Sequence, residues 1–239
     1  MRAAALIPAY QAARHVGEVI DRLKALPAPP DVLVVNDGSR DDTAAVAERH
    51  GARVLSFPAN RGKGHALLAG FEALREAYDG VVTLDADGQH PPEHFPDFVA
   101  AAERGADLVL GARARSPEMP PSRRFANAFS SGWSTWLAGQ RVSDSQCGYR
   151  LYGREVLKRT PLTAGRYEFE TEIVVRAARL GFRLGEVVIP TVYGEEKSQI
   201  RTFSDVPRIV GVMMRLTVEG LFPPAAMRRA AREMPAGAR

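Results

Sequence analysis

Two carboxylates end the short apolar stretch Val81-Val-Thr-Leu-Asp-Ala-Asp-Gly-Gln-His90. Side chains two residues apart on an extended chain point to the same side, so Asp85 and Asp87 are expected to face one site. They follow a predicted strand, and ligands bind at such strand ends in open α/β sheets. With the Gln89 amide oxygen beside them, the two acids suit a hard divalent cation that carries phosphates. An isolated pattern of this kind is more often a solvated turn, so the other motifs decide.

The composition is that of an ordinary soluble globular protein. The 239 residues are 45% hydrophobic and 25% charged, and 32 basic against 28 acidic side chains give a net charge of +4. This excess is too small to predict a nucleic-acid partner. Cys147 is the only cysteine, which excludes an intramolecular disulfide and a cysteine-based metal cluster. The first residues lack the apolar segment of a signal peptide, and no apolar stretch approaches the ~18 residues of a membrane span, so we expect a cytoplasmic location.

Short apolar strands alternate with helical patterns through the first half of the chain. We expect strands at residues 3–8, 31–36, 53–57, 80–84 and 107–112. We expect helices at residues 16–26, 41–50, 64–78 and 93–104. This alternation predicts βαβ units and therefore an α/β fold, with a doubly wound, mostly parallel sheet sandwiched by helices.

The pattern changes in the second half. We expect a loop at 113–124, a helix at 125–137, an extended polar segment at 143–152, a helix at 167–180, a strand at 183–190 and a charged loop at 193–203. An amphipathic helix over 206–222 follows, and the basic residues after it are expected to be frayed. The predicted organisation is one domain over 1–203, a C-terminal amphipathic helix over 204–222 and a flexible basic tail over 223–239.

Polar residues follow three of the predicted strands, and parallel strands would gather them at one edge of the sheet. The three segments are Ile7-Pro-Ala-Tyr10, Val35-Asn-Asp-Gly-Ser39 and Leu84-Asp-Ala-Asp-Gly-Gln89. Together they resemble the GT-A glycosyltransferases of the large inverting family 2. The resemblance extends from Pro8 to about Arg208, so it covers nearly the whole chain.

The resemblance implies a nucleotide-sugar donor and a GT-A, Rossmann-like fold. It implies that Asp37 contacts the nucleotide base or ribose and that Pro8 and Tyr10 also line the donor site. Asp85 and Asp87 would hold Mg²⁺ or Mn²⁺ against the donor diphosphate. Many members of the family have a second acid directly before the Asp37 position, whereas this chain has Asn36 there.

A narrower resemblance concerns the acceptor. The segment Asp85-Ala-Asp-Gly-Gln-His-Pro-Pro-Glu93 is similar to the polyprenyl-phosphate (dolichyl-phosphate) hexose synthases, in which the glutamine joins the metal site, so Gln89 is an expected ligand. Asp144-Ser-Gln-Cys-Gly-Tyr-Arg150 resembles their second motif, which lines the sugar and the acceptor and includes Gln146. Tyr193-Gly-Glu-Glu-Lys-Ser198 with Arg201 resembles a C-terminal signature. The implied reaction moves a hexose from a donor of the GDP-mannose or UDP-glucose type to a polyprenyl phosphate.

Two further segments are candidates for the donor diphosphate. Asn60-Arg-Gly-Lys-Gly-His65 fits neither the Walker A nor the Rossmann spacing, but a glycine-rich, cationic helix start can bind phosphate through its free N–H groups and Lys63. A plain helix entry is the alternative. Lys197 and Arg201 could close on the diphosphate, unless their loop is only a solvated charged segment.

Four arginines indicate a phosphate acceptor. Arg113, Arg115, Arg123 and Arg124 crowd the loop predicted after residue 112, and guanidinium groups match phosphate oxygens in pairs. We therefore expect Arg113, Arg123 and Arg124 to bind the acceptor; a solvated, mobile loop is the alternative. A phosphate is already ionised near neutral pH and needs no general base, because its second pKa is about 6.

A hydroxyl acceptor would need a base, and Asp144 is the best candidate. The catalytic set is expected to be Asp87, Arg113, Arg124 and Asp144. Two alternatives stay open: a family 2 enzyme with a hydroxyl acceptor, and a nucleotide-sugar-binding or nucleotidyl-transfer protein on the same fold.

The helix predicted over 206–222 has a broad apolar surface followed by arginines. Such a helix can lie on an anionic membrane, which would make the protein peripheral on the cytoplasmic face. A polyprenyl acceptor favours that interpretation, because its tail cannot leave the bilayer. The helix could equally pack on the sheet or on a second subunit.

Overall fold

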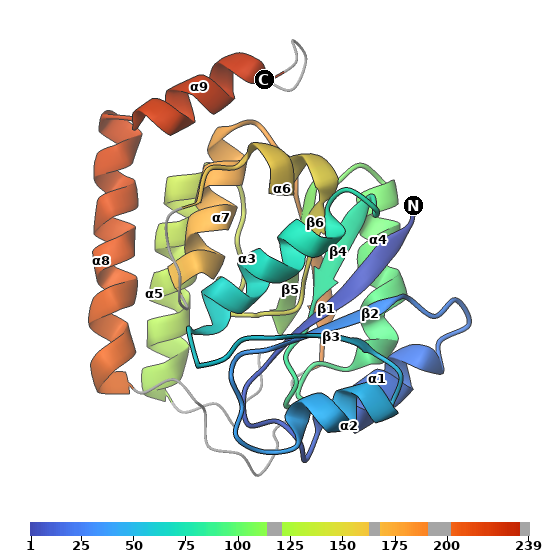
Figure 1. The fold of residues 1–239 in the computed structure, drawn as a ribbon. Helices are drawn as coiled ribbons and strands as arrows, with labels where there is room; N and C mark the ends of the chain where they lie inside the picture. The colour runs from blue at the N-terminus through green and yellow to red at the C-terminus, as the bar shows by residue number, and fades with distance from the viewer. Residues whose placement is uncertain (114–120, 163–167, 191–201, 235–239) are drawn as a thin grey trace.

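The computed structural model describes residues 1–113, 121–162, 168–190 and 202–234 (Figure 1). Its centre is a seven-stranded sheet in the order β3-β2-β1-β4-β6-β5-β7. The strands are β1 Ala3–Ala9, β2 Val32–Asn36, β3 Arg53–Ser56, β4 Gly80–Thr83, β5 Leu108–Arg113, β6 Arg150–Gly153 and β7 Leu184–Ile189. All pairings are parallel except those of β6, which runs antiparallel to both β4 and β5.

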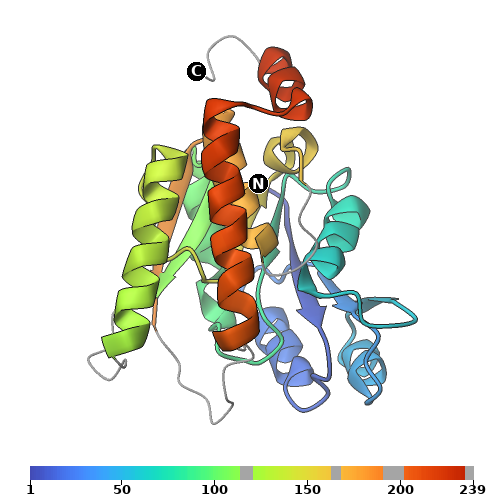
Figure 2. The same ribbon diagram turned by 90° about the vertical axis from the view of Figure 1, so that its left-hand side faces the viewer.

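Helices cover both faces of the sheet. One face carries α1 Val16–Lys24, α2 Thr43–Arg49 and, after the turn η1 Pro92–His94, α4 Phe95–Glu103. The other face carries α3 Lys63–Leu74, α6 Arg154–Arg159 and α7 Glu168–Arg179. A further layer, α5 Pro121–Ala138 and α8 Thr202–Leu221, packs on α7, and α9 Ala225–Glu233 follows (Figure 2).

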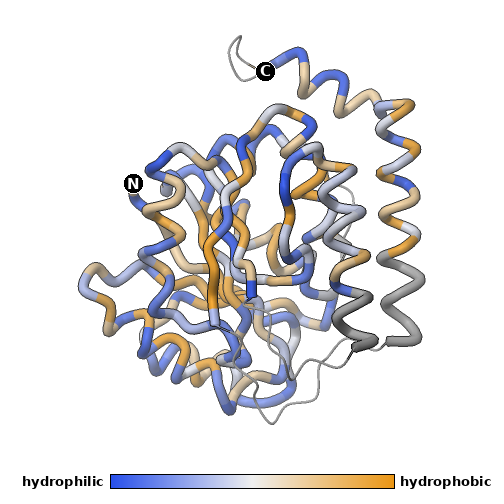
Figure 3. Tube along the Cα trace, turned by 180° about the vertical axis from the view of Figure 1, so that it is seen from behind, coloured by the Kyte–Doolittle hydropathy of each residue, from blue (hydrophilic) through white to orange (hydrophobic). Residues whose placement is uncertain are grey.

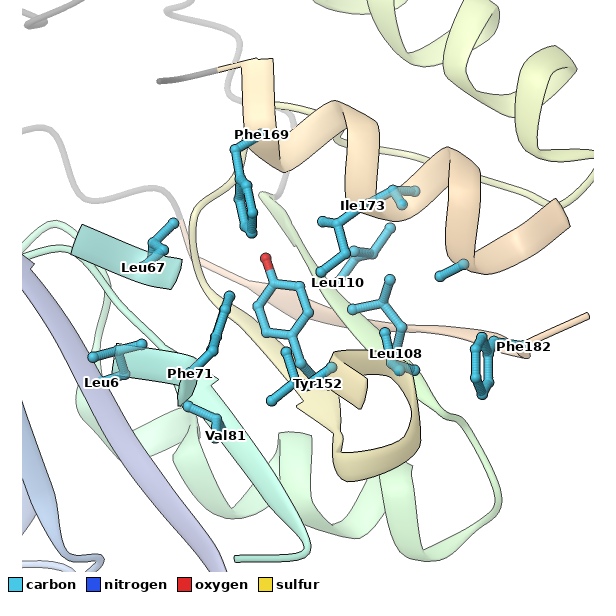
Figure 4. Close-up of a cluster of buried hydrophobic side chains, with 14 of the residues drawn as sticks. Leu6, Leu67, Phe71, Val81, Leu108, Leu110, Tyr152, Phe169, Ile173 and Phe182 are labelled. Atoms are coloured by element: carbon cyan, nitrogen blue, oxygen red, sulfur yellow. The ribbon is translucent and has the colours of Figure 1, made fainter. Parts of the chain in front are cut away.

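The buried sides of these elements follow directly from the sequence pattern. The five residues of β2 are all buried, as expected of an inner parallel strand covered on both faces, and the middle of the sheet is correspondingly hydrophobic (Figure 3). On the α3 side, Tyr152 of β6 packs edge-on against Phe71 of α3, with 4.9 Å between ring centroids. Phe169 of α7 stacks on Phe71 at 6.0 Å, so α3, β6 and α7 share one core (Figure 4).

The first half of the chain matches the sequence prediction closely, whereas the part of the second half before α8 differs in three places. Only 150–153 of the predicted extended segment forms a strand, and that strand is inserted antiparallel between β4 and β5. The short helix α6 was not predicted. Helix α5 begins at Pro121, so Arg123 and Arg124 lie in its first turns and the prediction that they belong to a loop is wrong.

The C-terminal region also differs from the prediction of a frayed tail. Residues 225–233 form α9, and Met227, Ala230 and Met234 are buried in the core on the α3 side. The guanidinium of Arg159 in α6 donates a hydrogen bond to the carbonyl of Glu233 at 2.7 Å. The sequence showed the basic side chains of this segment but not the apolar stripe beneath them.

Helix α8 is attached to α7 by a small apolar cluster and by buried charges. Met213 and Leu216 pack against Val175 of α7 and Leu137 of α5. Arg176 of α7 is 3% exposed and bonds both Glu172, at 2.8 Å, and Glu219 of α8, at 2.8 Å. Breaking a buried pair of this kind is costly, so α8 is held in one position on the domain.

Substituting Met227 tests whether α9 is part of the folded domain. Because its side chain is 8% exposed, Met227→Ala should lower the free energy of unfolding by about 2 kcal/mol. Met214→Ala on α8 is the matched control, since that side chain is 55% exposed and its loss should change stability by no more than ~0.5 kcal/mol. Chemical denaturation measures both; equal, small effects would mean that the tail is frayed after all.

Candidate functional site

The polar strand ends meet at one edge of the sheet, as predicted. Ala9 at the end of β1 lies beside Asn36 at the end of β2, and Thr83 at the end of β4 lies beside Leu6 of β1. Since β6 is antiparallel, its first residue, Arg150, pairs with Thr83 at the end of β4. The segment 144–149, which precedes β6, therefore lies at the same edge as the acid motif that follows β4. A strand parallel to β4 would have placed this segment at the opposite edge.

Asp37 fixes the start of α3. The side chain is buried, and its carboxylate accepts hydrogen bonds from the backbone of Arg61 at 2.7 Å, from that of Gly62 at 2.8 Å and from the Asn60 amide at 3.0 Å. Gly38 is needed beside it, because a Cβ there would meet the Ala59 backbone at 2.3 Å in a left-handed conformation. Tyr10, at the end of β1, is 42% exposed, as a side chain available to a ligand would be.

Lys63, the first residue of α3, lies between two carboxylates. Its Nζ is 2.7 Å from Asp85 after β4 and 3.0 Å from Glu170 in the first turn of α7. Burial alone would lower the pKa of Lys63, but the two carboxylates raise it well above its ordinary value. Burial alone would raise the pKa of Asp85, but mainly the charge of Lys63 lowers it to about 2. This ion pair thus joins three elements at the acid motif.

The second acid and its neighbours have distinct environments. Burial and the charge of Asp85 raise the pKa of Asp87, whose Oδ1 accepts a hydrogen bond from the Gln89 backbone at 3.0 Å. Burial lowers the pKa of His90, and its Nδ1 accepts a hydrogen bond from the Asp85 backbone at 3.1 Å, so the ring is neutral. His90 thereby orients the backbone of the acid motif.

Asp85 and Asp87 fit a metal ion whose remaining ligands are phosphate oxygens and water. Within the described ranges there is no group of three or more histidine, cysteine, aspartate or glutamate side chains placed to hold a metal ion. Mg²⁺ in phosphate-binding sites commonly uses one or two carboxylates, with phosphates and water supplying the rest. Asp85 and Asp87, with the Gln89 amide, provide such a partial set of hard oxygen ligands, and a cation would offset the burial and the charge of Asp85 that together raise the pKa of Asp87.

Arg113 and Asp144 form a second charged pair on this edge. Arg113 ends β5 and donates from Nε and Nη2 to the two carboxylate oxygens of Asp144, at 2.7 and 3.1 Å. The Gln146 backbone adds a hydrogen bond to Asp144 at 3.0 Å. Burial would raise the pKa of Asp144, but Arg113 holds it below its ordinary value. The side chain of Gln146 donates to Ser130 of α5 at 3.3 Å.

A buried guanidinium shapes the loop that carries Asp144. Arg150 is fully buried and donates to the carbonyl oxygens of Ser145 at 2.8 Å, of Cys147 at 2.7 Å and of Glu170. Gly148 lies in the same loop, where a Cβ would meet the Lys63 Nζ at 2.8 Å and an Asp85 oxygen at 3.0 Å. The loop backbone at Gly148 therefore lies close against the Lys63–Asp85 pair, and a larger residue there would displace the ends of these two side chains.

The structure brings most of the predicted residues to this edge. Pro8, Tyr10, Asp37, Lys63, Asp85, Asp87, Gln89, Arg113, Asp144 and Gln146 all lie at strand ends or in the segments that follow or precede them. Arg123 and Arg124 lie in α5, where their side chains are not described, and Lys197 and Arg201 lie outside the described residues. Sequence reasoning missed Glu170, Gly148 and the structural role of Arg150. Acids at positions 168, 170 and 172 of the sequence favour the start of a helix, and nothing in their spacing points to Lys63.

Comparison with known proteins agrees with this geometry. The model of the family described as glycosyl transferase family 2 matches residues 4–161. The undecaprenyl-phosphate mannosyltransferase of Micrococcus luteus is 35% identical over 208 residues, covering 82% of this chain and 85% of that protein. The polyprenol monophosphomannose synthase of Mycolicibacterium smegmatis is 33% identical over 202 residues, covering 79% of this chain and 76% of that protein.

Among solved structures, glucosyl-3-phosphoglycerate synthase from Mycobacterium tuberculosis in complex with UDP has a TM-score of 0.73. It is 23% identical and covers 90% of this chain and 79% of that one, which confirms the predicted GT-A fold. The same synthase has also been crystallised with Mn²⁺ and UDP. The matched family model and the identity to these relatives show that the chain belongs to glycosyl transferase family 2.

Proposed function

We propose that this protein transfers a hexosyl group from a nucleoside diphosphate sugar to a polyprenyl phosphate. The observation that carries the proposal is the Arg113–Asp144 pair on the same sheet edge as the acid motif. Relatives whose names specify undecaprenyl or polyprenol phosphate acceptors support it. The family match leaves the nucleotidyl-transfer alternative without support.

The state of Asp144 favours a phosphate acceptor over a hydroxyl acceptor. A general base must accept a proton, and a carboxylate works best when its pKa is raised toward the working pH. Asp144 is instead held in two hydrogen bonds by Arg113, which keeps its pKa low. An ionised phosphate oxygen attacks without a base, so Asp144 is better suited to orient Arg113 toward that anion.

The donor would lie across the ends of β1, β2 and β4. Pro8, Tyr10 and Asp37 would line the nucleotide, with Asp37 acting at least partly through the loop 60–62 that it holds. Asp85, Asp87 and Gln89 would hold Mg²⁺ or Mn²⁺ at the diphosphate. That metal, when bound, would offset the charge of the leaving nucleoside diphosphate. Lys197 and Arg201 remain candidates for the same diphosphate, and Arg123 and Arg124 for the acceptor.

The exposed face of α8 offers a membrane contact for the lipid. Val210, Met214, Val218, Leu221 and Phe222 are exposed there, and Phe129 and Trp136 are exposed on the neighbouring α5 (Figure 2). Arg228, Arg229 and Arg232 are exposed on α9. In the described part of the chain no helix is both long enough and apolar enough to cross a bilayer. We infer that these helices rest on the cytoplasmic surface of the membrane and hold the enzyme near its acceptor.

A donor screen tests the proposed reaction. The full chain is incubated with a short polyprenyl phosphate, Mg²⁺ or Mn²⁺, and GDP- or UDP-hexoses in turn. We expect one donor to yield a glycosyl-phosphate lipid, detected by mass spectrometry after extraction. A glycoside formed only with a hydroxyl acceptor, in place of the lipid product, would support the alternative acceptor class.

Two substitutions separate orientation of Arg113 from base catalysis. Arg113→Ala should reduce use of the lipid phosphate by about 1.5–3 kcal/mol per lost charged hydrogen bond while sparing donor hydrolysis by water. Asp144→Asn keeps one hydrogen bond to Arg113, so we expect a loss of about tenfold, seen mainly in the KM for the acceptor. Steady-state kinetics decide: a fall of several orders of magnitude in kcat for Asp144→Asn would identify a general base and thus a hydroxyl acceptor.

Vesicle flotation tests the membrane contact. Replacing Met214, Val218, Leu221 and Phe222 together with serine should abolish binding to vesicles that contain anionic lipid, because each position contributes exposed apolar surface. Thermal stability should be unchanged, since the buried face of α8 is untouched. Neutral phosphatidylcholine vesicles are the control and should bind the wild type more weakly. Equal flotation of wild type and variant would contradict the docking model.

A further inference from the structure

The Lys63 ammonium is paired with Asp85, a carboxylate that we propose as a metal ligand. Its Nζ is 2.7 Å from an Asp85 oxygen, closer than it is to Glu170 at 3.0 Å. A divalent cation on Asp85 and an ammonium at this distance repel each other strongly, since both positive charges would share one carboxylate. Lys63 holds Oδ1 of Asp85, so a metal bound to the same carboxylate competes with the ammonium for its negative charge.

Glu170 is positioned to receive the withdrawn ammonium. Its side chain is buried, and its backbone carbonyl is fixed by the fully buried Arg150. Glu170 belongs to α7, whereas Lys63 begins α3 and Asp85 follows β4, so the two carboxylates are held by separate elements. The flexible stem of lysine allows Nζ to shift toward Glu170 while the helix start, anchored by Asp37, stays in place.

Gly148 limits where else the ammonium could move. A Cβ at this position would lie 2.8 Å from Nζ, 3.0 Å from Oδ2 of Asp85 and 3.2 Å from its Oδ1, so the loop backbone covers the pair on that side. The ammonium is therefore enclosed between the two carboxylates and the loop. Its side chain is only 17% exposed, which leaves little access to solvent.

We propose that Lys63 is a tethered cation that neutralises Asp85 until a divalent metal replaces it, and that Glu170 then retains the ammonium beside the metal. Glu170 is thus a positioning residue that acts through Lys63. The inference rests on the proposed metal site at Asp85 and Asp87. It predicts that Lys63 and the metal compete in the absence of donor, and that Glu170 weakens this competition by offering the ammonium a second partner.

Calorimetric titration of the full chain with Mn²⁺ alone tests the competition. Lys63→Met removes the competing charge and should tighten Mn²⁺ binding by about tenfold or more. Glu170→Gln should weaken it by a similar factor, because a nearby negative charge is lost and Lys63 keeps only Asp85. Lys158→Met is the matched control: it removes a lysine that pairs with Glu76 at 2.7 Å outside the site, and Mn²⁺ binding should be unchanged.

The double variant Lys63→Met with Glu170→Gln guards against poor folding, because it removes the pair without leaving Glu170 a buried, unpaired charge. Removing Lys63 should tighten Mn²⁺ binding more in the Glu170→Gln background than in the wild type. Equal effects in the two backgrounds would overturn the role of Glu170. Mn²⁺ binding by folded Lys63→Met that is no tighter than wild type would overturn the competition.

Asp85→Asn separates this inference from the proposed metal site. The variant should lose Mn²⁺ binding, and unchanged binding would overturn the metal site and the inference together. Loss of binding in Asp85→Asn with no gain in Lys63→Met would overturn the inference alone. If the wild type binds no Mn²⁺ without donor, we expect Lys63→Met to bind Mn²⁺ under the same conditions. Absence of Mn²⁺ binding by folded Lys63→Met would then overturn the proposal.

Discussion

The arrangement of the site depends on one buried guanidinium. Arg150 begins β6 and donates to carbonyl oxygens of Ser145, Cys147 and Glu170. A buried charge without such partners costs several kcal/mol, so these bonds fix the loop that carries Asp144 and the first turn of α7 relative to the sheet. These bonds thereby support the positions from which Asp144 pairs with Arg113 and Glu170 pairs with Lys63.

Two charged clusters lie at the sheet edge, one around Lys63 and one around Arg113. In the first, Lys63 is balanced by Asp85 and Glu170, next to the acids suited to a metal. In the second, Arg113 is balanced by Asp144. Each cation is already paired, so an incoming anion must exchange partners with a carboxylate rather than meet a free charge. Exchange of this kind favours ligands with several charged oxygens, such as a diphosphate or a phosphate monoester, over neutral ones.

The sequence predicts the strands of the first half of the chain well and the second half of the chain less well. Asp85, Asp87 and Asp37 follow parallel strands, and parallel strands bring their carboxyl ends to one edge whatever the details of packing. Residues 150–153 are placed by tertiary pairing with β4 and β5, which local pattern does not encode. Glu170 meets Lys63 only through that arrangement. The sequence did not predict helix α9, because its three buried apolar residues are few and are interspersed with exposed arginines.

Helix α7 connects the site with the surface of the molecule. Its first turn carries Glu170 at the site, while Glu172 and Arg176 pair with Arg215 and Glu219 of α8. Because a helix is rigid over so few turns, the exposed face of α8 is held at a fixed distance from the acid motif. A polyprenyl phosphate in a membrane has its phosphate at the surface and its tail below it. If the enzyme rests on α8, its acid motif would therefore lie at a fixed distance from the membrane surface, where the acceptor phosphate is.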